Sequence, residues 1–470
     1  MGRKLLYLTV AVILGLMLRT MLAEAKSDSA TMDEGVHLTA GYSYIQTQDN
    51  RLNPEHPPLV KDLAGLAVST ESFNFPIKWF KSHVIGQYDL GFKFMYHSGN
   101  DPDRILYLAR LPIVAITVVL GLFVFLWSRE LNGTAAGLFS LVLFAFDPNF
   151  IAHGHYVTHD VPLSAAIVIN LYLVWRYLKN PTRLRWLLSG VSLGLALLTK
   201  FSAPLLFPAY LVILVYLAVK DGGVRTVGAP AAAGLETAKS TSAAEAKGPA
   251  VGLADKTRSI PSAFQGRNIS RTLRRFWRYS LPFIGMAGVA AVLIYIVYGL
   301  NMMAMPVDVQ YSIMWRMLPA PAPFLSFLGQ TGLRPLSYFL MGLDIVKNHV
   351  ADGQLIYFMG RITPGHILYY PVAFLVKSTL PTLFLVGVAI IFGRRVKSKN
   401  PLAEVALLST MIIFLITVLL GKLDLGIRYI LPFYALFYVY AGKFIKLVRV
   451  ESFGRWIGGR FRPARSMLNG

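Results

Sequence analysis

Long apolar runs, separated by polar segments, follow one another along the chain. A helix needs roughly 20 mostly apolar residues to cross a bilayer, and ten runs approach or reach that length. The windows 134–146 and 186–198 are the shortest of them. The pattern predicts an all-α polytopic membrane protein with about ten transmembrane helices, outward-facing loops and juxtamembrane helices. The windows are 5–23, 106–127, 134–146, 161–177, 186–198, 201–219, 281–298, 371–392, 402–420 and 429–445.

Polar segments between the windows divide the chain into two membrane modules. Residues 222–261 are rich in Ala, Gly, Ser, Thr and Lys, a composition typical of disordered linkers. The predicted organisation is an N-terminal transmembrane module, 1–219, with a first outer loop at 24–105; a disordered basic cytoplasmic linker, 220–278; a C-terminal transmembrane module, 279–447, with an outer loop at 301–370; and a basic cytoplasmic tail, 448–470.

Charge gives these modules an orientation. The 470 residues are 55% hydrophobic and carry a formal net charge of +22. With the basic start of the chain inside, every basic cluster lies on the cytoplasmic side, as the positive-inside rule requires. The clusters are Arg176, Lys179, Arg183 and Arg185; Arg267, Arg271, Arg274, Arg275 and Arg278; Arg394, Arg395, Lys397 and Lys399; and Lys443, Lys446, Arg449, Arg455, Arg460, Arg462 and Arg465.

Composition also excludes some classes of function. The chain has no cysteine, which excludes disulfides and thiolate metal sites. The basic clusters attract anionic lipid of the bilayer, and we expect no nucleic-acid partner because no nucleic-acid-binding motif accompanies them. Residues 1–25 share a basic start and an apolar run with signal peptides, but the length of the run favours a retained helix.

Two adjacent carboxylates, Asp33 and Glu34, follow the first apolar window. A carboxylate at the outer membrane surface can deprotonate an incoming hydroxyl or amine, so the pair is a candidate for general-base catalysis. Glu34 also stands three residues after Thr31, the spacing of a capping box at a helix start. The two interpretations are compatible, because a helix N-terminus favours a nearby anion.

A proline-rich step, NPEHPPLVKDLAG, occupies residues 53–65 of the first outer loop. Its two prolines predict an extended entry into an amphipathic helix over 59–68 that lies on the membrane. His56 and Lys61 are then candidates to contact a phosphate. A simple turn followed by a surface lysine would show the same pattern.

The outer turn before the window 161–177 is crowded with ionisable side chains. Asp160 is a candidate second acid that orients an acceptor or another side chain. An ionisable residue at the end of a membrane span is energetically costly, which favours a functional role for it. His153, His155 and His159 are an alternative set of divalent-metal ligands. Their spacing matches no standard ligand pattern, so we expect no metal.

Cations stand at the outer boundary of the later windows. Lys377 lies about two turns into its window, where it needs an anion or a path to water. A lipid phosphate at headgroup depth supplies that anion, whereas snorkelling of the side chain is the alternative. Tyr369 and Tyr370 stand at the same boundary, and an aromatic belt at the membrane interface would explain them equally well. Predicted donor-phosphate ligands are Lys200, Arg361, Lys377 and Arg428; predicted contacts to donor or acceptor are His56, Lys61, His366, Tyr369 and Tyr370.

Outward acids beside outward cations suit sugar transfer from a lipid phosphate, and with these motifs the chain resembles the C-type glycosyltransferase superfamily. The resemblance is to bacterial polyprenyl-phosphate-sugar-dependent transferases related to protein O-mannosyltransferases and the lipid A aminoarabinose transferase. Asp33-Glu34 looks like the acidic motif of the first outer loop, and His56-Pro57-Pro58-Leu59 like the proline-containing step that follows. Weaker similarities lie at Asp160, at Leu198-Thr199-Lys200-Phe201, at Tyr369-Tyr370-Pro371 with Lys377, and at Arg428-Tyr429 with Pro432.

The resemblance implies inverting transfer from a polyprenyl-phosphate-linked sugar, with Asp33 as base, Glu34 and Asp160 as further catalytic residues, and no cofactor. It also implies a bacterial inner membrane and a periplasmic active site. The chain departs from the best-known members in its smaller number of spans and its short outer loop 301–370, which leaves the acceptor open among protein, lipid and glycan.

A polytopic transporter or a lipid or glycan flippase is the alternative from another class. Such proteins share many spans and charges inside the membrane. They usually have paired repeats and broken helices with polar residues near mid-bilayer, and the sequence has neither repeats nor that placement.

Overall fold

The computed structural model describes residues 2–82, 86–220, 263–318 and 323–448. Within these ranges the chain is mostly helical, and six helices are long and apolar enough to cross a membrane. Three shorter apolar helices accompany them, so the predicted count of about ten spans is not reached by length alone. The six candidate spans are Arg3–Ser27, Pro102–Asn132, Asp160–Lys179, Ser270–Asn301, Pro401–Leu420 and Ile427–Leu447, and the shorter ones are Thr134–Ala145, Ala203–Val219 and Leu380–Phe392.

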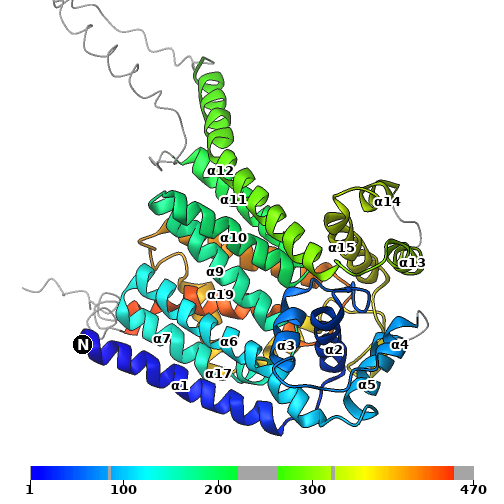
Figure 1. Ribbon diagram of the computed structural model, residues 1–470. Coiled ribbons are helices and arrows are strands. Elements are labelled where there is room, and N and C mark those ends of the chain that lie inside the picture. The colour runs from blue at the N-terminus through cyan, green and yellow to red at the C-terminus, as the bar shows by residue number, and fades with distance from the viewer. Residues whose placement is uncertain (1, 83–85, 221–262, 319–322, 449–470) are drawn as a thin grey trace, which may run out of the picture.

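Helices of the N-terminal module pack side by side in the order α1, α7 and α6, α9, α10 (Figure 1). The central pair is α9 with α19, whose residues are buried along most of their length. The elements of this bundle are α1 Arg3–Ser27, α6 Pro102–Asn132, α7 Thr134–Ala145, α8 Pro148–His153, α9 Asp160–Lys179, α10 Arg183–Thr199, η1 Ala203–Leu205, α11 Leu206–Val219, α12 Ala263–Asn301, α16 Tyr369–Lys377, α17 Leu380–Phe392, α18 Pro401–Leu420, η2 Ile427–Ile430, α19 Leu431–Ala441, η3 Gly442–Phe444 and α20 Ile445–Val448.

Large apolar side chains are exposed on the outward faces of the peripheral helices. α1 exposes Leu5 and Leu8, and α17 exposes Phe384 and Ile390. A helix that is apolar on its outer face as well as its inner one is stable only where the surroundings are apolar too, as in a bilayer. The surface of the bundle therefore agrees with an integral membrane protein.

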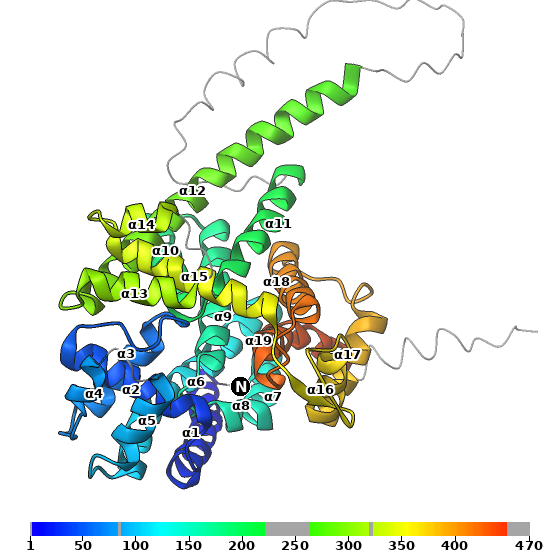
Figure 2. The same cartoon turned by 90° about the vertical axis from the view of Figure 1, so that its right-hand side faces the viewer.

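Short helices gather at one end of the bundle, which we call the loop end; Figure 2 views the molecule from this side. The first outer loop contributes four of them, and the segment 302–370 contributes three helices and a two-stranded antiparallel hairpin. These elements are α2 Met32–Thr47, α3 Leu59–Val68, α4 Ile77–Lys81, α5 Gln87–Tyr96, α13 Val307–Met317, α14 Pro323–Gly329, α15 Arg334–Asp352, β1 Ile356–Phe358 and β2 Arg361–Thr363.

α2 and α3 cross in direct backbone contact at two glycines. A Cβ atom on Gly41 would lie 1.8 Å from the carbonyl oxygen of Lys61, and one on Gly65 would lie 2.3 Å from Gly41. Neither position has room for any side chain, so glycine is required at both. This crossing fixes α3 against the helix that begins with the acidic pair.

Three predictions about the fold need correction. The window 371–392 is not one helix: it is divided between α16 and α17, because Thr379 caps a new helix whose first turn contains Pro381. The predicted all-α class omits the hairpin β1–β2. The predicted linker, 220–278, ends earlier, because α12 already begins at Ala263 and arginines, which favour helices, extend it from the apolar span. The rest of that linker and the tail 449–470 lie outside the described residues.

Candidate active site

The loop end brings together a carboxylate and a guanidinium that are almost 400 residues apart in the sequence. Asp33, in the first turn of α2, accepts a hydrogen bond from Nη1 of Arg428 at 2.5 Å between Oδ2 and Nη1. Arg428 lies in η2, which follows Gly426; this glycine has φ +95°, a conformation that other residues adopt only with strain. The turn before η2 therefore aims the arginine at the start of α2.

A second ion pair extends this one into a chain of four charged groups. Lys200, the C-cap of α10, donates to Oδ1 of Asp160 at 2.5 Å, and Arg428 Nε lies 3.9 Å from Oδ2 of the same carboxylate. The ammonium of Lys200 also lies 4.1 Å from the ring centre of Tyr429. The chain Asp33–Arg428–Asp160–Lys200, which we call the charged chain, joins the starts of α2 and α9 to the end of α10 and to η2.

The two ends of the charged chain differ in access. Asp33 and Arg428 keep 29% and 23% of their side chains exposed, whereas Asp160 and Lys200 keep 5% and 10%. Burial raises the pKa of Asp33, but the positive charge of Arg428, its hydrogen bond to the carboxylate and the charge of Lys200 outweigh burial, so the net pKa of this carboxyl is lowered. Asp33 is therefore an ionised, accessible carboxylate at neutral pH.

Glu34, the other half of the acidic pair, faces the opposite way into the protein. It forms a two-point ion pair with Arg110 of α6, at 2.8 Å and 2.7 Å, and both side chains are buried. Its oxygens also accept from the backbone N–H groups of Val157 and Thr31. The bond from Thr31 is the glutamate half of the predicted capping box. Every carboxylate oxygen of Glu34 is thus engaged within the protein.

The prolines of the 53–65 step lead into α3, whose bounds agree with the predicted helix over 59–68. Lys61 does not point outward: its ammonium is buried and donates to the carbonyl oxygens of Asn53 at 2.6 Å and His56 at 2.7 Å. Burial lowers its pKa to about 7. The predicted phosphate contact is instead a tie that closes the turn before α3.

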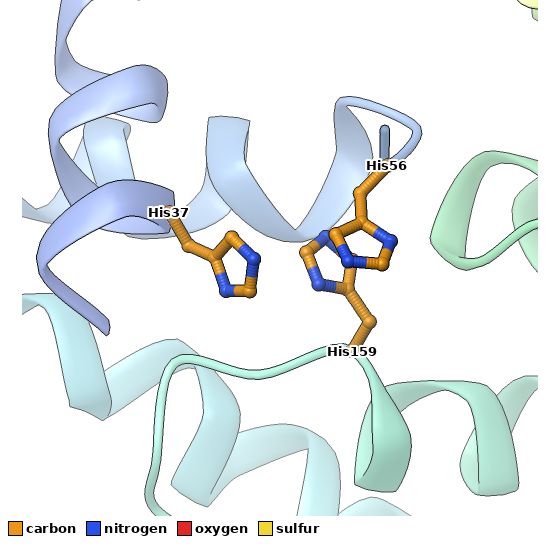
Figure 3. A group of neighbouring side chains, drawn as sticks. All are labelled: His37, His56 and His159. Atoms are coloured by element: carbon orange, nitrogen blue, oxygen red, sulfur yellow. The ribbon is translucent and has the colours of Figure 1, made fainter. Parts of the chain in front are cut away.

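Three histidine rings meet next to this turn. Figure 3 shows His37 of α2, His56 of the 53–65 step and His159 at the N-cap of α9 with their rings turned toward one another. The rings of His56 and His159 are stacked with centres 4.3 Å apart, and the ring of His37 meets that of His159 edge-on at 4.4 Å. Burial lowers the pKa of His37 to about 4 and the pKa values of the other two further below the usual range, so all three rings are neutral.

The predicted alternative metal ligands, His153, His155 and His159, do not come together as these three rings do. His155 instead contacts Asp28, with its Nε2 3.1 Å from Oδ2 of the carboxylate. His153 packs against the ring of Tyr156. Among the described residues the group that brings three imidazole nitrogens together shares only His159 with the predicted set.

The remaining predicted contacts lie on the other side of the loop end. Arg361 is exposed at the start of β2, and Lys377 is exposed at the last residue of α16. His366 anchors its own loop through a backbone bond to Asp424. Tyr370 is buried and donates to the carbonyl oxygen of Leu423 at 2.6 Å, and Tyr369 stacks against it edge-on. Within the described residues no hydrogen bond or ion pair joins any of these five side chains to the charged chain, so their predicted roles stay predictions.

Two residues of the site were missed by sequence reasoning. His37 follows Asp33 by one helical turn, which places both on one face of the predicted helix start. Arg110 lies within the apolar window 106–127, and an arginine there requires a partner. Both signals were present in the sequence.

Comparison with known proteins agrees with this architecture. A family model described as dolichyl-phosphate-mannose-protein mannosyltransferase matches residues 106–234. No curated protein sequence matches the chain.

Among solved structures, ArnT from Cupriavidus metallidurans bound to undecaprenyl phosphate is similar with a TM-score of 0.53 and 13% identity, over 98% of this chain and 63% of that one. The Archaeoglobus fulgidus oligosaccharyltransferase in its apo form has a TM-score of 0.48 and 15% identity, over 98% of this chain and 53% of that one. The chain thus spans less than two thirds of either relative. The family model, which matches part of the chain, and the ArnT-like fold agree with the resemblance to the C-type glycosyltransferase superfamily.

Proposed function

We propose that the chain is an inverting glycosyltransferase that moves a sugar from a polyprenyl-phosphate donor to an acceptor on the extracytoplasmic face of the membrane. The observation that carries this proposal is the charged chain, in which an accessible carboxylate, Asp33, lies against the cations Arg428 and Lys200. A base for the acceptor and positive charge for a leaving phosphate then stand in one site. The likeness to ArnT, solved with undecaprenyl phosphate, supports a lipid phosphate as the donor.

The reaction is a single displacement. Asp33 takes the proton of the acceptor hydroxyl or amine as that atom forms a bond to the anomeric carbon of the sugar. The bond from that carbon to the phosphate oxygen breaks, and its electron pair leaves with the lipid phosphate. Attack from the side opposite the leaving group inverts the anomeric centre, and Arg428 stabilises the charge that develops on the phosphate.

The positions of four further charged residues suggest how each supports the reaction. Asp160 orients Arg428 and Lys200 through the ion pairs described above. Lys377 and Arg361, both exposed at the loop end, bind the donor phosphate as it arrives from the membrane. Glu34 is a positioning residue, because its buried pair with Arg110 holds the start of α2 and leaves no oxygen for the reaction.

The test uses the full chain purified in detergent, because vectorial transport by a transporter or flippase has no meaning without a closed membrane. The protein is incubated with a panel of labelled polyprenyl-phosphate sugars and with candidate protein, lipid and glycan acceptors. We expect release of the free lipid phosphate and a labelled product of inverted anomeric configuration, both absent with Asp33→Asn. Donor that stays intact with every acceptor, in a protein that retains its fold, would contradict the proposal.

A further inference from the structure

The three-histidine cluster has no part in the transfer reaction just described. His37, His56 and His159 come from α2, from the turn before α3 and from the start of α9, and one ring nitrogen of each lies within 4.8 Å of the others. The cluster contains no carboxylate ligand among the described residues. Three segments that are distant in the sequence thus converge on one small volume.

Three ring nitrogens of the cluster lack a hydrogen-bond partner among the described residues. Both Nδ1 and Nε2 of His159 are buried without a partner, and so is Nδ1 of His56. His159 is only 2% exposed. A buried polar atom that binds nothing is unfavourable, and a neutral imidazole nitrogen without a proton can bind only a donor or a metal.

His37 is already oriented for a ligand. Its Nδ1 lies 2.8 Å from the carbonyl oxygen of Val157 and therefore carries the proton that it donates there. The lone pair of its Nε2 is left for the other two rings, toward which the ring points in Figure 3. A bond from the second ring nitrogen to a backbone carbonyl is the arrangement that fixes metal-ligating histidines.

We propose that His37, His56 and His159 form a three-histidine site for a divalent transition metal of the zinc type. Neutral imidazoles suit Zn²⁺, Cu²⁺, Ni²⁺ and Co²⁺, and a set without carboxylates does not suit Mg²⁺ or Ca²⁺. Zinc–nitrogen bonds are about 2.0–2.1 Å long, and the three rings already bring their nitrogens within 4.8 Å of one another. Three protein ligands leave a fourth position for water or another oxygen. This inference goes beyond the proposed function and replaces the expectation that no metal is bound.

The bound metal fastens the two acids of the site to one another. His37 follows Asp33 by one helical turn, and His159 directly precedes Asp160. A metal held by both rings fixes the start of α2 against the start of α9, while His56 adds the turn before α3. The metal is therefore a positioning device for the charged chain.

The first test measures metal without any substrate. The full chain carries an affinity tag free of histidine, is stripped with EDTA in detergent, and is then dialysed against Zn²⁺ or Co²⁺. We expect one Zn²⁺ per chain by elemental analysis, and the intense visible absorption of tetrahedral Co²⁺ after loading with cobalt. Stripped wild-type protein that takes up no metal and shows no cobalt spectrum overturns the proposal, whatever the variants do.

Matched variants then separate the two candidate ligand sets. We expect His37→Gln and His56→Gln to lose the metal and the cobalt spectrum, and His153→Gln to match wild type. Zn²⁺ should raise the thermal unfolding midpoint of wild type and of His153→Gln but not of the two cluster variants. Retention of metal in both cluster variants, or its loss only in His153→Gln, overturns the assignment. Because no donor or acceptor is present, failure here leaves the transferase assay of the proposed function to stand or fall separately.

Discussion

Two neighbouring residues, Asp33 and Glu34, each pair with an arginine, and the two pairs have opposite designs. The Glu34–Arg110 pair keeps 0% and 1% of its side chains exposed, whereas the Asp33–Arg428 pair keeps 29% and 23%. Successive residues of a helix point about 100° apart, so one carboxylate faces α6 and the other faces η2.

Completeness of hydrogen bonding distinguishes the two pairs as much as burial does. Arg110 gives its remaining donors to the carbonyl oxygens of Ala25, Asp28 and Ser29, at 3.0, 2.8 and 2.9 Å. All donors of Arg110 and both oxygens of Glu34 are thus engaged within the protein. We therefore expect this inner pair, Glu34–Arg110, to stabilise the fold. The outer pair, Asp33–Arg428, is partly exposed to solvent, and its arginine also lies near Asp160. Either group of this pair can therefore exchange its partner for a substrate. An acidic pair in a sequence can thus contain one buried, fully bonded carboxylate and one accessible carboxylate.

The largest effect is expected from breaking the inner pair. Arg110→Gln leaves the carboxylate of Glu34 buried without a cation, which should lower the free energy of unfolding by about 3–5 kcal/mol. Thermal unfolding in detergent measures this loss. Arg104→Gln is the matched control, because Arg104 lies on the same helix and pairs with Glu71 at the surface, where a pair contributes little. Equal stability of the two variants would show that the Glu34–Arg110 pair does not contribute to the free energy of unfolding.

Breaking the outer pair, Asp33–Arg428, should strongly lower turnover without loss of stability. Asp33→Asn keeps the shape of the side chain and removes its basicity, so turnover should fall roughly 10²-fold or more. The thermal unfolding midpoint should stay near that of wild type because the site is partly exposed. Labelled-sugar transfer at saturating donor measures the effect. Wild-type turnover in this variant would remove Asp33 as the base.

A third carboxylate, Asp62, sharpens the comparison because it is only half paired. One oxygen accepts from Asn301 at 2.9 Å, and the other is buried without a partner. Burial raises the pKa of Asp62 to about 6. A folded-state pKa above the unfolded value of about 3.9 means that stability is lost as the pH rises through this window and stays lost above it.

Asp62→Asn should therefore be more stable than wild type at pH 8, by about 3 kcal/mol, and the advantage should shrink toward pH 4. Unfolding midpoints of both proteins at several pH values between 4 and 8 measure the difference. An advantage that does not change with pH would contradict the raised pKa as its cause.

The smallest effect is expected at the rim of the open pair. Lys377→Met should raise the apparent KM for the lipid donor about tenfold and lower turnover, because the phosphate is both the anchor and the leaving group. Lys347→Met is the control, since Lys347 is an exposed lysine of α15 outside the proposed site. Donor kinetics like those of wild type in Lys377→Met would mean that the side chain only snorkels to the headgroups.

Sequence patterns predicted the helical class and many element positions, because apolar windows and proline steps are local signals. The window 134–146 is α7 and the amphipathic helix is α3 with the same bounds. The window 371–392 was read as one span because hydropathy averages over Ser378 and Thr379, although Thr379 caps a new helix. The hairpin at 356–363 is too short to leave a periodic signal.

The members of the charged chain were each singled out from the sequence, but their pairing was not. Asp33 and Arg428 meet only because α19 lies in the centre of the bundle and Gly426 turns η2 toward α2. The histidine cluster was missed for the same reason: His37 and His56 approach each other through the glycine contact between α2 and α3, which no single segment reveals. Residues that act together across the fold become visible only once the packing is known.

The links from Arg110 also set an order for biosynthesis. The carbonyl oxygens of Ala25, Asp28 and Ser29 and the carboxylate of Glu34 are translated and delivered to the membrane before α6 exists. Until that second long helix inserts, the end of α1 and the start of α2 have no cation to hold them. The start of α2, with its accessible carboxylate Asp33, therefore depends on a later segment for its fixed position. A chain arrested before α6 would leave the carboxylate of Glu34 without the guanidinium that neutralises it in the folded protein.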